Sequence, residues 1–162
     1  MKVLEDLATR PRFQLDQLPT LDLTTANAHP GGHPNSIVWL LWHTGRELDI
    51  QLSHLSGAPE VWRDYAARVG LGDEMGYGHT DAQAHAVAVD SLERLDALRE
   101  YVAATLAATE SYVASLSDAS LDDVVDTNWT PAVTRGVRLV SIIDDAIQHL
   151  AQCHYIVGMA SK

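Results

Sequence analysis

The sequence predicts an all-α fold: a four-helix bundle with a long crossover connection between the second and third helices. Apolar residues recur at helical spacing in four long segments. Capping residues, glycine or proline bound these segments. No alternating apolar and polar pattern of useful length is present, so no sheet is expected. With 162 residues the chain is long enough for one core, and we expect a single domain spanning 1–162.

The first helix is predicted over residues 1–20, where leucines and a phenylalanine supply the apolar positions. Pro11 falls inside this segment. Because proline lacks a backbone N–H, we expect the helix to be kinked there or to start only after it. Residues 21–34 are rich in proline and glycine and are predicted to form a connecting loop.

The second helix is predicted to begin after Asn35 or Ser36, either of which can cap it, and to run to about Leu55. Gly57 follows and favours termination. Most of the helix is apolar, which indicates burial. A more polar strip recurs every four positions, at Asn35, Trp39, His43 and Glu47.

The crossover is predicted to occupy residues 57–80. It contains a short helix over 60–69 and a glycine-rich loop over 70–78. Thr80 to Gln83 forms a capping box, which predicts that a long third helix starts there and continues to about Leu116.

The last helix is predicted to follow an acidic loop over 117–128. Thr130 is expected to cap it, with Pro131 at its first position, and it runs to about Met159. Four main helices, with one short helix between the second and third, are typical of a bundle with a crossover.

The charge of the chain excludes several partners. Its formal net charge is −11 with histidines neutral, which argues against nucleic acid and against an anionic membrane surface. No apolar run reaches the ~18 residues of a membrane-spanning helix. The first residues are acidic where a signal peptide would be apolar. The single cysteine excludes an internal disulfide. We therefore expect a cytoplasmic protein.

The most informative residues are Asp145 and His149 on the last helix. Their spacing places a carboxylate and an imidazole on one helix face, with Cβ atoms about 6 Å apart. His43 lies on a polar strip of the second helix, which we expect to face them. Two imidazoles and one carboxylate suit a divalent transition metal and leave positions open for water or substrate.

The alternative interpretation is structural. His149 would then donate a hydrogen bond to Asp145, and His43 would be satisfied separately. Glu47 is a possible fourth ligand or an acceptor for His43, and Gln152 is a second polar neighbour. Cys153 is interpreted as core filler. His79 is interpreted as a turn residue that could line the mouth of a pocket.

These residues resemble those of a known family. The stretch 35–43, Asn-Ser-Ile-Val-Trp-Leu-Leu-Trp-His, resembles the second helix of the DinB-like superfamily, which includes the YfiT proteins and the mycothiol-dependent maleylpyruvate isomerases. The stretch 149–152, His-Leu-Ala-Gln, is similar to the family's His-x-Gly-Gln. The loop 76–80 and the run 136–141 are similar to an actinobacterial branch of that family.

The resemblance implies a four-helix bundle, often dimeric, with a divalent metal held by three residues that match His43, Asp145 and His149. Zinc or nickel is favoured, and iron or manganese is the alternative. Many relatives have histidine at the position of Asp145, and the maleylpyruvate isomerases have glutamate. Asp144 is adjacent but points about 100° away on a helix, so Asp145 is preferred.

Three functions are compatible with such a site. The first is a thiol-dependent transferase or isomerase, which would use mycothiol as co-substrate and act on a small electrophilic molecule. The second is a metal-dependent hydrolase. The third is non-enzymatic: a homodimeric bundle that binds a metal or a small ligand.

Overall fold

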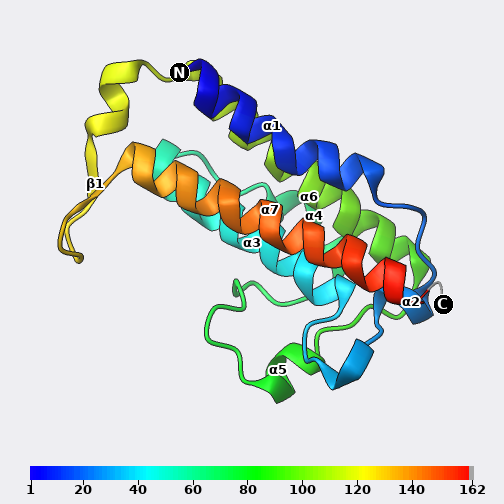
Figure 1. The fold of residues 1–162 in the computed structure, drawn as a ribbon. Coiled ribbons are helices and arrows are strands. Elements are labelled where there is room, and N and C mark those ends of the chain that lie inside the picture. The colour runs from blue at the N-terminus through cyan, green and yellow to red at the C-terminus, as the bar shows by residue number, and fades with distance from the viewer. Residues whose placement is uncertain (161–162) are drawn as a thin grey trace.

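Four long helices form the body of the structure, a computed structural model that describes residues 1–160 (Figure 1). They are α1 (Lys2–Gln17), α3 (Ile37–Ser56), α6 (Leu92–Ser115) and α7 (Arg135–Ala160). The predicted all-α bundle with a long crossover between the second and third long helices is confirmed.

Helices α3 and α6 run in one direction, and α1 and α7 run in the other (Figure 1). Helix α3 packs against α6 and α7, and α1 packs against the same two helices. Contacts between helix ends support this arrangement. The amino group of Met1 lies 2.6 Å from Asp118, just beyond the end of α6. The carbonyl of Leu55, near the end of α3, accepts a hydrogen bond from Arg135 at the start of α7.

Helix α1 continues through Pro11, so the expectation that it starts only after this residue is wrong. Pro11 is buried on the same stripe as Leu4, Ala8 and Leu15. Burial of the ring against the core helps to offset the hydrogen bond that proline cannot make. The connection predicted as a loop over 21–34 includes two short helical turns, α2 (Leu23–Ala26) and η1 (Pro30–Gly32).

Two helices replace the predicted third helix over residues 80–116. The capping box at Thr80 is present, but it caps only α5 (Asp81–His85). The chain then leaves the helical path, and α6 starts afresh with Ser91 as its N-cap. The reason is a tertiary contact. The side chain of Asn27 binds both the N–H and the carbonyl of Val89, at 3.1 and 2.9 Å, and holds this segment in a non-helical conformation.

The segment before α7 also differs from the prediction. It contains η2 (Asp118–Asp122) and a small antiparallel pair of strands, β1 (Val124–Asp126) and β2 (Val133–Thr134). These strands are too short to produce a recognisable alternating pattern. The hydroxyl of Thr134 accepts a hydrogen bond from the N–H of Val137. Helix α7 therefore begins at Arg135, and the prediction that Thr130 caps it is wrong.

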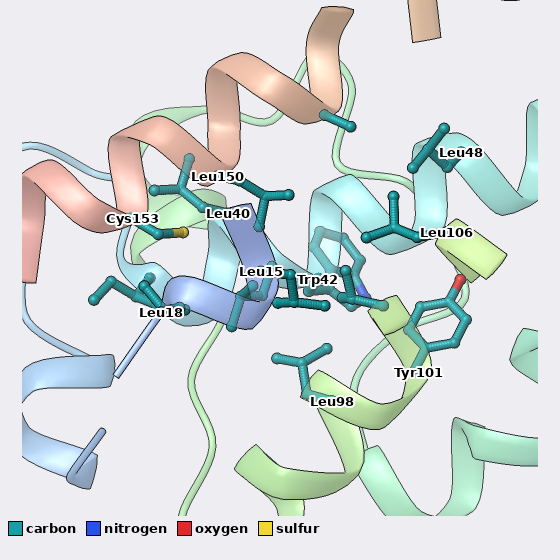
Figure 2. Close-up of a cluster of buried hydrophobic side chains, with 14 of the residues drawn as sticks. Leu15, Leu18, Leu40, Trp42, Leu48, Leu98, Tyr101, Leu106, Leu150 and Cys153 are labelled. Carbon is teal, nitrogen blue, oxygen red and sulfur yellow. The ribbon is translucent and has the colours of Figure 1, made fainter. Parts of the chain in front are cut away.

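The core lies between the four helices and is apolar (Figure 2). A Cβ atom built on Gly45 would lie 2.5 Å from the ring of Tyr101, so only glycine permits this close approach of α3 to α6. The crossover adds α4 (Trp62–Val69), which packs on α6. Among residues 1–160, no helix combines the length and the apolar character needed to cross a membrane.

Candidate metal centre

His43 on α3 converges with Asp145 and His149 on α7. One ligand atom from each side chain can be chosen so that all three lie within 4.8 Å of one another. The Nε2 atom of His43 lies 3.8 Å from Oδ2 of Asp145, and Nε2 of His149 lies 3.5 Å from Oδ1. Both distances exceed the 2.7–3.2 Å of a normal N–H···O hydrogen bond. The structure therefore lacks the direct hydrogen bond from His149 to Asp145 that the structural interpretation requires.

The other nitrogen of each imidazole is already engaged. Nδ1 of His43 donates to the carbonyl oxygen of Met75, and Nδ1 of His149 donates to Oε1 of Gln152 at 2.8 Å. Because these oxygens can only accept, each Nδ1 carries the proton and each neutral imidazole keeps a free lone pair on Nε2. This is the arrangement in which histidine ligates a metal while a neighbouring acceptor fixes its orientation.

The carboxylate of Asp145 completes a set of acceptors that face one another. Its Oδ2 atom is inaccessible to solvent and has no hydrogen-bond partner among residues 1–160. A buried acceptor without a partner is destabilising by about 1–3 kcal/mol, more if charged. The Nε2 lone pairs of the two histidines and the Asp145 carboxylate thus lie close together, with no positive charge between them in the part of the chain that the structure describes. A divalent cation would supply that charge. The donor set therefore fits a metal ion.

Burial reinforces this chemistry at His43. Loss of solvent lowers the pKa of its imidazole, and the nearby His149 lowers it further, against the raising effect of the Met75 carbonyl. The side chain is consequently held neutral near pH 7, which is the form that can bind a metal.

A glycine in the crossover loop brings the Met75 carbonyl to His43. Gly76 has a φ of +82°, and a Cβ atom there would lie 2.7 Å from the ring of Trp42. Both the conformation and the close approach require glycine. The indole of Trp42 also donates to the carbonyl of Gly72 at 3.1 Å, which fastens the loop a few residues earlier.

A buried ionic network anchors the same loop, and sequence reasoning missed it. The guanidinium of Arg46 donates to the carbonyl of Asp73 and to Glu60, in the latter case at 2.9 Å. Asp49 accepts from the backbone N–H groups of Val61 and Trp62 at the start of α4, and from the hydroxyl of Tyr101. The spacing of Arg46 and Asp49 on one helix is an ordinary surface pattern, so no signal separated them from exposed charges.

The other sequence candidates occupy distinct positions. Gln152 contacts His149, as expected for a supporting residue. Cys153 is fully buried in the core, and burial raises its pKa to about 12, so it does not join the three candidate ligands. Asp144 is exposed and accepts a hydrogen bond from Gln148 at 2.7 Å, which leaves Asp145 as the residue that faces the histidines.

Glu47 lies one helical turn beyond His43, outside the three-residue cluster. Burial, and to a lesser extent the charge of Asp145, raise its pKa to about 8. Its Oε2 atom is buried and has no hydrogen-bond partner in the described part of the chain. Near pH 7 this carboxyl is therefore mostly protonated, which makes it a hydrogen-bond donor or acceptor beside the site.

Aromatic residues form one wall of the site. The ring of Trp39 stacks on His43, with centroids 4.7 Å apart, and its indole N–H donates to Nδ1 of His79 at 3.3 Å. Trp39, His43 and His79 line a cavity of about 220 Å³. His79 thus lines a pocket beside the site, as the sequence allowed.

A larger cavity of about 530 Å³ adjoins the site on the side of Glu47 and Ser141. Trp129 lines it and is 64% exposed, so this tryptophan is not a core residue. Trp42 and Trp62 are buried, as tryptophans usually are.

Comparisons with known proteins place the chain among helical bundles of this kind. A family described as the DinB superfamily matches residues 8–153. The crystal structure of a conserved protein from Enterococcus faecalis is 38% identical in sequence and covers 96% of this chain and 91% of its own, with a TM-score of 0.77. No curated protein matches the chain.

Proposed function

The chain belongs to the DinB superfamily, and on that basis we propose that it is a metal-dependent enzyme in which a low-molecular-weight thiol attacks a small electrophile. In a transfer the thiol stays attached to the product, and in an isomerisation it is released again. His43, Asp145 and His149 hold the metal in this proposal. The observation that carries it is the convergence of two bare Nε2 atoms on a carboxylate whose Oδ2 atom lacks a partner.

The residues around the site have separate tasks. The Met75 carbonyl and Gln152 hold the two imidazoles in the orientation that exposes Nε2. Trp39 covers one face of His43 and keeps water from it. Glu47 holds a proton one turn away and can donate it to a substrate. A divalent metal, when bound, acts as a Lewis acid that lowers the pKa of a coordinated thiol or water.

Zinc or nickel is the proposed metal, because two nitrogens and one oxygen suit either, and iron or manganese is the alternative. The proposed thiol is mycothiol, as the resemblance to the actinobacterial branch implies. We place this reaction in the cytoplasm, where low-molecular-weight thiols are kept reduced. The proposed active form is a homodimer. Exposed apolar side chains on α7, among them Tyr155 and Met159, support association.

The test uses purified full-length protein loaded with cobalt, whose absorption reports ligation. Adding 2-mercaptoethanol is expected to produce a sulfur-to-metal charge-transfer band. Turnover of the electrophile monochlorobimane is expected to require both metal and thiol. No band and no thiol-dependent turnover would contradict the proposal. Metal-dependent turnover of an ester without thiol would favour a hydrolase instead.

A further inference from the structure

The cavity of about 530 Å³ begins where the candidate metal centre ends. Because α3 and α7 run in opposite directions, Glu47 lies one turn after His43, and Ser141 lies one turn before Asp145, at the same end of the site. Both residues line the cavity. One helical turn rises about 5.4 Å, so these two lining residues lie only about that far along their helices from His43 and Asp145.

Much of the cavity wall is apolar. Helix α7 contributes Val137 and Ile142, and the strand segment contributes Val133. Two aromatic side chains lie at the opening. Tyr77 is 88% exposed and Trp129 is 64% exposed, although both line the cavity. Exposed aromatic rings beside a hollow are typical of a binding surface, because they offer apolar contact area to an occupant.

The cavity offers no free positive charge. Arg138 is the one cation among the described residues that line it. Its guanidinium donates to Oδ2 of Asp126 at 2.8 Å and to the amide oxygen of Gln51, so its charge is already paired. The net charge of the chain, −11, adds a field that repels anions.

One group in the cavity wall lacks a partner. The Oε2 atom of Glu47 is buried and makes no hydrogen bond to any residue that the structure describes. Most buried polar atoms in proteins are paired with protein or water, so an exception needs a reason. Glu47 also lines the cavity, so a rotation of its side chain would bring this atom to a ligand that donates a hydrogen bond.

We infer that this cavity binds a small uncharged or cationic molecule that has an apolar body and directs an amine, hydroxyl or amide donor at Glu47, and that it rejects carboxylates and phosphates. In the proposed function this molecule is the electrophilic substrate, and the inference rests on that proposal. The preference comes from the chain's own residues, so it persists without metal.

The experiment compares three probes of one shape: benzylamine, benzyl alcohol and benzoate. Each is titrated into metal-free full-length protein, and the indole ¹H–¹⁵N signal of Trp129 is followed by NMR. We expect benzylamine and benzyl alcohol to shift this signal saturably, and benzoate at equal concentration to leave it unmoved. Repeating the titrations with zinc separates direct ligation of benzoate from cavity binding.

Three variants complete the design. A bound ammonium favours the ionised form of the Glu47 carboxyl, and glutamine cannot ionise. Glu47→Gln is therefore expected to weaken benzylamine about tenfold and to leave benzyl alcohol nearly unchanged. Val137→Phe adds a ring at the cavity wall and is expected to weaken the shifts. Val140→Phe is the matched control, since Val140 is a similarly exposed valine of α7 that does not line the cavity.

Any of three results would overturn the inference. These are metal-free binding of benzoate as tight as that of benzylamine, unchanged binding in Val137→Phe, and no saturable shift with any probe. None of them bears on whether the three candidate ligands hold a metal, so a failure of this inference can be told apart from a failure of the proposed function.

Discussion

The Nδ1 atom of His149 lies 2.8 Å from the Oε1 atom of Gln152, one turn further along α7. This contact fixes the proton of His149 on Nδ1 and directs the lone pair of Nε2 toward Asp145. On the other helix, the carbonyl of Met75 does the same for His43. The two imidazoles are thus oriented by an amide side chain in one case and by a loop backbone in the other.

Replacing Gln152 with leucine removes the acceptor that orients His149. We expect the variant to bind zinc about 10–100-fold more weakly, in line with other residues that support metal ligands. Competition with a chromophoric chelator measures the change. Gln148→Leu is the matched control, because Gln148 is exposed and its side chain donates to Asp144 rather than to His149. Equal zinc affinity in the two variants would show that Gln152 does not orient the ligand.

Substitution of Gly76 tests the role of the crossover loop. In Gly76→Ala, the new Cβ atom would meet the ring of Trp42 at 2.7 Å, so the loop must shift and carry the Met75 carbonyl away from His43. We expect zinc affinity to fall at least as far as in Gln152→Leu. Gly78→Ala introduces similar backbone strain, at a φ of +78°, but meets no atom within 4 Å. It should retain zinc, and a loss as large as that of Gly76→Ala would refute the account.

The raised pKa of Glu47 predicts a specific pH dependence of stability. Its pKa rises from 4.5 to about 8 on folding, so in this window the folded state holds a proton that the unfolded chain has released. The free energy of unfolding of metal-free protein therefore falls as pH rises toward 8. Above that value Glu47 is ionised in both the folded and the unfolded state, so it causes no further loss of stability.

The comparison with Glu47→Gln isolates this effect. The lowered pKa of His43 has the opposite effect: it makes the free energy of unfolding rise with pH. This effect is confined to pH values below the ordinary histidine pKa of 6.5. Between about pH 6.5 and 8, the parent protein should lose stability relative to Glu47→Gln by on the order of 1 kcal/mol. Urea unfolding at several pH values measures it. Curves that stay parallel for the two proteins would show that Glu47 is ionised throughout.

Cys153 should be chemically inert in the folded protein. Its side chain is fully buried, its pKa is raised to about 12, and only a thiolate reacts readily. Iodoacetamide is expected to leave native protein unlabelled under conditions that fully label protein unfolded in guanidinium. Rapid labelling of the native state would mean that the thiol is accessible, and would reopen its role at the metal centre.

Local signals were sufficient for α3. The hydroxyl of Ser36 accepts from the N–H of Trp39 at 3.1 Å, and Gly57 ends the helix with a φ of +73°. The grouping of His43 with Asp145 and His149 was also predictable. Spacing on one helix placed two of them on a single face, and the polar strip of α3 supplied the third.

Long-range contacts explain what the sequence did not reveal. The capping box at Thr80 formed as predicted, yet its helix ends at His85 because Asn27 holds Val89 in another conformation. These partners are far apart in the chain, and no periodic pattern links them. The acceptor for His43 is a backbone carbonyl of Met75, which a side-chain motif cannot indicate.

The most direct test of the central claim is elemental analysis of protein purified without chelator, compared with His43→Ala, Asp145→Ala and His149→Ala. His154→Ala is the control, since His154 lies on α7 and contacts the carbonyl of Gln14 rather than the site. We expect one divalent metal per chain in the parent and in the control, and loss of that metal in the three ligand variants. Full metal content in all three ligand variants would contradict it.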